Sequence, residues 1–158
     1  MRNYNLFKEK LAFSIKQSEI HLKRIDEAFE FLKEYYNFPI SEKEFEEILI
    51  NKTHLAFADQ IIYRFSKAQD SIGAKVIKSF LLYEGEDINK PFLDLLERFE
   101  KLQILNIEDW YAFREIRNEI AHEYEDDSNK AVDIINSIYK SKEKLKNILI
   151  KIKEISGL

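Results

Sequence analysis

A chain of 158 residues with a formal net charge of −4 is long enough for one hydrophobic core, and its acidity argues against a protein that coats nucleic acid nonspecifically. Hydrophobic residues make up 45% of it, with only three glycines and two prolines, which excludes the turn-rich composition of an all-β protein and the polar bias of a disordered one. The absence of cysteine excludes disulfides and thiolate metal sites, and suits a reducing compartment.

The sequence contains no pattern that directs a chain to or through a membrane. Charges interrupt the apolar residues of the first segment, MRNYNLFKEKLAF, so it lacks the apolar region of a signal peptide. No apolar run approaches the roughly 18 residues that a transmembrane helix needs. With no internal repeat or low-complexity linker, we expect a cytoplasmic protein that forms one domain over residues 1–158 and makes no membrane contact.

Three long stretches have helical periodicity. Apolar residues recur at spacings of three and four from Tyr4 to Tyr36, interrupted only by Ser18. A second long helix is predicted from about Lys52 to Tyr83, with Gly73 as a soft point. A third follows Ser128, and the six lysines in its second half are interpreted as a solvated face.

Shorter helices are expected between and beside the long ones. Proline at position 39 ends the first periodic stretch, and Ser41 with Glu44 forms a capping box that opens a short acidic helix. Another helix is predicted around Phe92 to Phe99, and Asn106 is placed to cap the next. The sequence therefore predicts an all-α fold, an elongated up-and-down bundle of two to three long helices with short accessory helices.

A basic stripe is predicted beside the apolar face of the second long helix. At 100° per residue its members fall within about 80° of one another. A solvated face is the ordinary explanation for such lysines and arginines, and contact with a phosphate backbone is the alternative. The stripe consists of Arg64, Lys67, Ser71, Lys75 and Lys78.

The stretch WYAFREIRNEIAHEY, from Trp110 to Tyr124, holds the most unusual chemistry of the chain. Its apolar side should anchor a helix, and the polar remainder includes Arg117 and His122, about 140° apart around an ideal helix. Such a separation leaves three possibilities: the long arginine side chain bends around the helix toward the histidine, the helix ends near the histidine, or a second copy of the chain completes the site. The apolar side consists of Trp110, Phe113, Ile116 and Ile120.

Arginine and histidine together suit phosphodiester cleavage in RNA. Histidine exchanges a proton near neutral pH, and arginine stabilises charge that develops on a phosphate. This chemistry needs no metal, and we predict no metal site because His21, His54 and His122 are scattered. Structural roles are also available: a helix-end cap for His122, an ion pair for Arg117 and a place at the core edge for Tyr124.

The segment Arg117 to Tyr124, RNEIAHEY, resembles the R-x4-H-x-Y motif of HEPN-domain toxins of the HepT family, which belong to bacterial and archaeal toxin–antitoxin pairs. Asn118 fits the family's preference for a polar residue after the arginine. The resemblance covers eight residues, and chain size, helical character and the late position of the motif agree with it. It implies a HEPN-like bundle and a homodimeric, metal-independent endoribonuclease without cofactor, whose two motifs meet between subunits. Arg117 and His122 would be catalytic, and Asn118 would shape the site.

The same resemblance implies a partner and a means of neutralisation. Members of the family are paired with a minimal nucleotidyltransferase antitoxin, which transfers AMP from ATP to the motif tyrosine, here Tyr124. Added phosphate beside Arg117 and His122 would exclude RNA. Two alternatives remain open: a HEPN-like module that binds nucleotide or a partner without cleavage, and a helical assembly subunit in which the motif is accidental.

Overall fold

The computed structural model describes residues 2–121 and 127–158, and all regular structure within these ranges is helical, as predicted. The second long helix contains a short π-helical segment, η1, so it is divided into three elements. In chain order the elements are α1 (Arg2–Lys33), α2 (Glu42–Ile50), α3 (Lys52–Ser71), η1 (Ile72–Val76), α4 (Ile77–Tyr83), α5 (Phe92–Lys101), α6 (Ile107–Ala121) and α7 (Ser128–Ser156).

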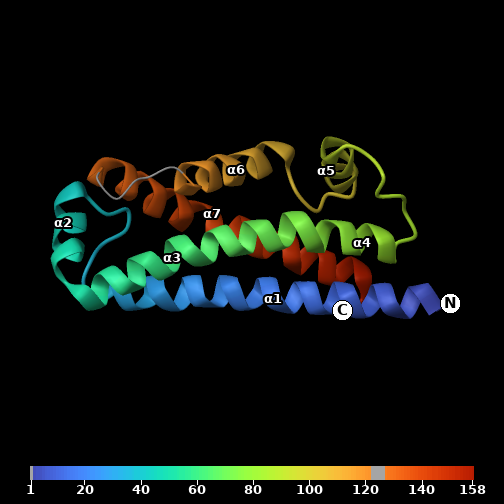
Figure 1. Cartoon of the computed structure of the whole chain (residues 1–158), viewed down its shortest axis with the longest axis horizontal. Helices are drawn as coiled ribbons and strands as arrows, with labels where there is room; N and C mark the ends of the chain where they lie inside the picture. The colour runs from blue at the N-terminus through green and yellow to red at the C-terminus, as the bar shows by residue number, and fades with distance from the viewer. Residues whose placement is uncertain (1, 122–126) are drawn as a thin grey trace.

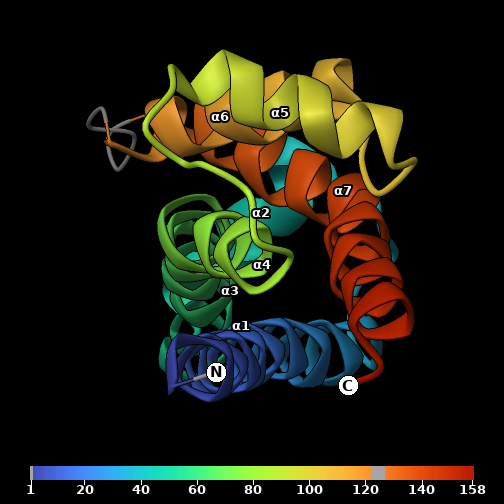
Figure 2. The same cartoon turned by 90° about the vertical axis from the view of Figure 1, so that its right-hand side faces the viewer.

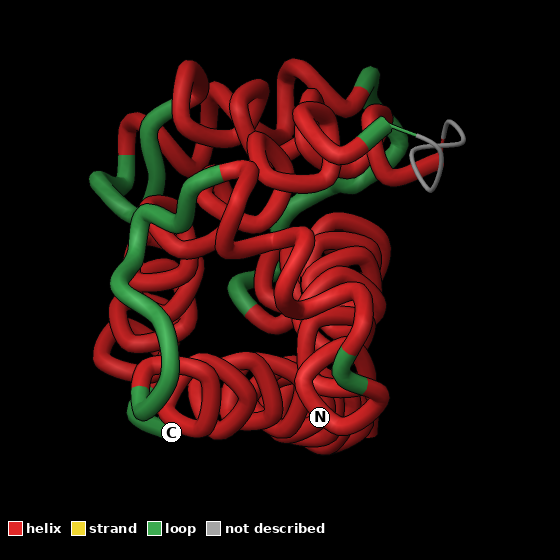
Figure 3. Tube along the Cα trace, turned by 90° about the vertical axis from the view of Figure 1, so that its left-hand side faces the viewer, coloured by secondary structure: helices red, strands yellow, loops and turns green. Residues whose placement is uncertain are grey.

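The helices form an elongated bundle whose long members alternate in direction (Figure 1). α1 runs along one edge, α2 turns the chain at the far end, and α3 to α4 returns beside α1. α6 then lies over α3, and α7 runs back to place both termini toward the same end. Seen from one end, α1, α3, α6 and α7 occupy the four sides of the bundle (Figure 2). The view from the other end shows helices on all four sides (Figure 3).

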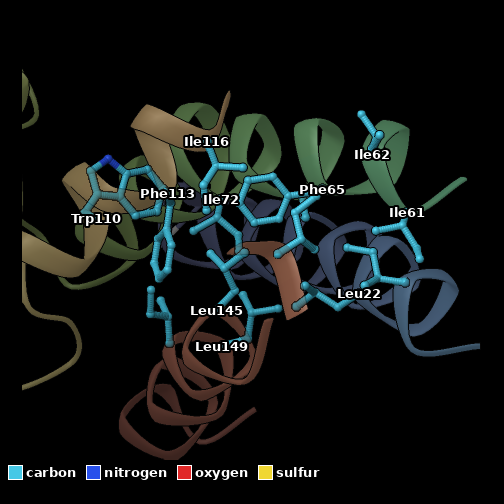
Figure 4. Packing of buried hydrophobic residues seen from close by; sticks show 14 of the residues in the cluster. Leu22, Ile61, Ile62, Phe65, Ile72, Trp110, Phe113, Ile116, Leu145 and Leu149 are labelled. Atoms are coloured by element: carbon cyan, nitrogen blue, oxygen red, sulfur yellow. The ribbon is translucent and has the colours of Figure 1, made fainter. Parts of the chain in front are cut away.

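Buried apolar side chains from every helix make up the core. Phe113 and Ile116 of α6 point toward Ile72 of η1 and toward Leu145 and Leu149 of α7 (Figure 4). Burying a side chain of this size stabilises a fold by about 1.5–3 kcal/mol. α6 is thereby fixed against two of the long elements.

The polar interruption in the first periodic stretch has a structural explanation. Ser18 is fully buried, and its hydroxyl donates to the carbonyl oxygen of Ser14 at 2.9 Å. The hydroxyl of Ser71, on α3, lies 2.8 Å from that of Ser18. Because the Ser18 proton is already used, Ser71 is the donor in this second bond. A polar pair therefore joins α1 to α3 inside the bundle.

Helix ends agree with the sequence in most places. The capping box of Ser41 and Glu44 is formed at the start of α2. α1 ends at Lys33, earlier than the region of Asn37 to Pro39, because the chain turns there and leaves Tyr36 buried outside the helix. The hydroxyl of Tyr36 lies 2.6 Å from Nδ1 of His54, which fixes this corner against α3.

The predicted soft point at Gly73 is the site of the π-helical segment. A Cβ atom at Gly73 would lie 2.9 Å from Cζ2 of Trp110, closer than atoms of this kind can approach. Glycine is therefore required where η1 and α6 pack together. Among the helices described, none combines the length and the apolar character needed to cross a membrane.

Candidate functional site

α6 carries the first half of the sequence motif, and its cap and core face hold it in place. The side-chain oxygen of Asn106 accepts a hydrogen bond from the backbone N–H of Glu108 at 2.8 Å, which confirms the predicted cap. Ile120 is only half-buried, whereas the other predicted core positions are covered. The covered residues of α6 are Trp110, Phe113 and Ile116.

Arg117 forms a two-point contact with Asp70 of α3. Its Nε donates to Oδ1 at 3.2 Å and its NH2 nitrogen donates to Oδ2 at 3.3 Å. The side chains are 33% and 51% exposed, so this pair contributes only about 0.2–1 kcal/mol to stability. Its larger effect is on geometry, because a two-point contact fixes the plane of the guanidinium. NH1 makes no hydrogen bond with any residue in the described ranges.

Beside this pair is a hollow of about 520 Å³, which we call the α3–α6 groove. It lies between α6 and the segment from the end of α3 to α4, with one residue of α5 at its edge. No cluster of three potential metal ligands occurs in the part of the chain that the structure describes. The groove is lined by Gln69, Asp70, Gly73, Ala74, Lys78, Phe92, Trp110, Arg114, Arg117 and Asn118.

The predicted basic stripe divides between two surfaces. Lys78 lines the α3–α6 groove, whereas NH1 of Arg64 lies 3.0 Å from Nδ1 of His21 on α1. Lys67 and Lys75 are on the His21 side, close enough to lower the pKa of that histidine. A uniform 100° per residue fails here because η1 has a wider turn, which shifts the register of the residues after it. Arg64, Lys67, Lys75 and His21 are called the outer basic cluster below.

His21 has a lowered pKa in this environment. Burial and the nearby positive charges of Arg64, Lys67 and Lys75 lower its pKa from the ordinary value of 6.5. Arginine has only donors, so Nδ1 of His21 must accept the hydrogen bond from Arg64 and carry no proton. Protonation would place another positive charge among these cations and remove this acceptor.

His122 and Tyr124 lie outside the described residues, as do Glu123, Glu125 and Asp126. In the sequence they join Ala121 of α6 to Asp127, whose side chain caps α7 by accepting from the backbone N–H of Lys130. Of the two predicted catalytic residues, the structure therefore places Arg117 alone.

No family model, curated protein or solved structure matches this chain.

Two residues of the site were missed in the sequence for different reasons. Arg114 precedes Arg117 by three and Asn118 by four, so helical spacing could have placed it on the same face. Asp70 belongs to another helix, 47 residues away in sequence, and local periodicity gives no information about such a pairing.

Proposed function

We propose that this protein is a metal-independent endoribonuclease and the toxin of a toxin–antitoxin pair. The main support is the position of Arg117, the first residue of the R-x4-H-x-Y sequence, beside a groove that also presents Lys78 and Arg114. This groove is a local concentration of positive charge on a chain of net charge −4. Such a surface favours a phosphodiester over a neutral substrate.

In the proposed reaction, His122 removes the proton of a 2′-hydroxyl, and the 2′-oxygen attacks the neighbouring phosphorus. The bond to the 5′-oxygen breaks as that oxygen takes a proton from a protonated histidine. The products are a 2′,3′-cyclic phosphate and a 5′-hydroxyl. Arg117 stabilises the charge on the phosphoryl oxygens, and Asp70 holds its guanidinium in one plane.

The proposed enzyme is a homodimer. Arg117 and His122 point about 140° apart on an ideal helix, so arginine from one subunit and histidine from the other meet more easily than both from one. Tyr111, Glu115 and Asn118 are exposed on α6, which leaves that helix accessible to a second copy.

The outer basic cluster offers a second RNA contact in this proposal. Tyr63 is exposed, and the charged groups of Arg64 and Lys67 each lie 5.6 Å from the centre of its ring. Single-stranded nucleic acid binds to such combinations of an aromatic ring and cations through stacking and phosphate contacts. Lys75 extends the positive charge along the same side of the bundle.

Cleavage of RNA in the presence of a chelator tests the proposal. The wild-type protein should cleave, Arg117→Ala should lose about 10²–10³-fold in rate, and His122→Ala about 10²–10⁴-fold. Arg24→Ala is the matched control, because Arg24 is exposed and its ion pair within the described residues is with Glu27 of its own helix. An activity that survives both substitutions would exclude the proposed pair.

Neutralisation by AMP is proposed for Tyr124. Each transferred AMP brings a negatively charged phosphate close in sequence to Arg117, where it would compete with RNA for the cations of the groove. Incubation with ATP and the cognate nucleotidyltransferase should raise the intact mass by whole AMP units. Tyr124→Phe should abolish the increase, whereas Tyr35→Phe, which alters an exposed tyrosine outside the proposed dimer face, should not. Modification that persists in Tyr124→Phe would assign the acceptor elsewhere.

The second candidate is a HEPN-like module that binds nucleotide or a partner without cleaving RNA. The pairing of Arg117 with Asp70 favours it, because a neutralised arginine is a weaker stabiliser of charge. RNA binding that depends on Arg117 without any cleavage would support this candidate over the nuclease.

A further inference from the structure

Trp110 forms part of the wall of the α3–α6 groove. Trp110 is 1% exposed, and its Nε1 has no hydrogen-bond partner among the residues described. Atom Cζ2 of the Trp110 ring lies against Gly73. Trp110 and Gly73 both line the groove.

Two cations of the groove are also unpaired. Lys78 comes from α4 and Arg114 from α6, and both are exposed. Neither forms an ion pair within residues 2–121 and 127–158, whereas the charge of Arg117 is partly offset by Asp70. Each of the opposed walls of the groove therefore presents one positive charge without an ion pair among the described residues, an arrangement that suits a bound phosphate.

The rest of the lining suits a nucleobase. The amide of Gln69, which is 7% exposed, and that of Asn118 supply both donors and acceptors. Phe92 gives an apolar ring at the edge. The groove volume of about 520 Å³ is within the range of small-ligand sites. A phosphate and a base can thus be accommodated together.

We propose that the α3–α6 groove binds the nucleotide of single-stranded RNA that is adjacent to the phosphate held by Arg117. Lys78 and Arg114 bind the phosphate of this nucleotide, and Gln69 and Asn118 contact its base. The claim that this nucleotide lies next to the cleaved bond rests on the proposed function. Binding itself requires no cleavage, so the two claims can fail separately.

Trp110 is the only tryptophan of the chain, and its fluorescence therefore reports directly on this groove. A tetranucleotide of 2′-O-methyl RNA serves as the probe, since it lacks the hydroxyl needed for cleavage. Titration of the wild-type protein should give a saturable fluorescence change. Lys78→Gln and Arg114→Gln should each weaken binding by about tenfold and reduce the slope of log affinity against log salt by about 0.7.

Lys140→Gln is the matched control, because Lys140 is exposed on α7 and forms no ion pair in the described part of the chain. It should leave affinity for the probe unchanged. Saturable binding that does not depend on Lys78 or Arg114 would overturn the proposed nucleotide site, as would the absence of any fluorescence change. Loss of binding in both variants, together with wild-type protein that never cleaves RNA, would retain the nucleotide site and reject the nuclease.

Discussion

At the scale of single residues, Asp70 determines how Arg117 is presented. Its two oxygens engage Nε and NH2 of the guanidinium and leave NH1 for a substrate oxygen. A carboxylate here also offsets the charge that would bind phosphate. Orientation and charge therefore have opposite effects on an incoming RNA.

Substitution Asp70→Asn should separate these effects. The amide keeps the shape but cannot accept from both nitrogens, so we expect kcat for RNA cleavage to fall by about 10–100-fold while KM falls or stays unchanged. Asp133→Asn, at an exposed position on α7, is the control. Folding stability should change by under about 1 kcal/mol, since the pair is partly exposed. A variant with unaltered kcat would show that Asp70 does not position Arg117.

His21 gives a prediction for pH dependence. Burial and the cations of the outer basic cluster lower its pKa in the folded protein below 6.5, so the unfolded chain binds more protons between the two pKa values. The stabilisation of the fold by neutral His21 is therefore fully present above pH 6.5. It is lost as the pH falls through the pKa of His21 in the folded protein. The difference in unfolding free energy between wild type and His21→Gln should therefore shrink from pH 7.5 to 5.5 in urea titrations. A constant difference would contradict a lowered pKa.

At the scale of elements, the π-helical turn of η1 brings Gly73 against Trp110. Glycine to alanine in a helix normally stabilises by about 1 kcal/mol, but overpacking a core costs about 1–3 kcal/mol. With 2.9 Å between the new Cβ and a buried ring atom, the steric cost should win, and Gly73→Ala should lower the unfolding free energy by up to about 2 kcal/mol.

Phenylalanine at position 110 provides the control for that substitution. It lacks Cζ2 and Cη2 of the indole, the two atoms nearest the new methyl group. In the Trp110→Phe background, Gly73→Ala should therefore be harmless or stabilising by urea unfolding. An equal loss in both backgrounds would place the clash elsewhere.

The sequence predicts elements better than it predicts contacts between them. The caps of Ser41 and Asn106 were found because each depends on residues within one turn. The sequence does not predict that the basic stripe divides between two surfaces, because this division follows from the π-helical turn. Lysines of α7 interpreted as a solvated face in fact reach other helices, as Lys142 does to Asp26 at 3.0 Å. Such pairings depend on tertiary packing, which periodicity does not specify.

At the scale of the whole molecule, α6 lies on an outer side of the bundle (Figure 2). Its exposed residues Tyr111, Glu115 and Asn118 are available to a second copy. Sedimentation equilibrium should give twice the 18.9-kDa mass of one chain. A mass of 18.9 kDa at the concentrations used for cleavage assays would contradict a site shared between subunits.

Mixing two inactive variants tests the shared ribonuclease site most directly. Arg117→Ala and His122→Ala are each assayed on RNA in chelator, then mixed, allowed to exchange subunits and assayed again. If one subunit supplies arginine and the other histidine, each mixed dimer regains one complete site, and activity should return to about a quarter of the wild-type level. Active wild-type protein with no recovery in the mixture would contradict the shared site, and inactive wild-type protein would contradict the nuclease itself.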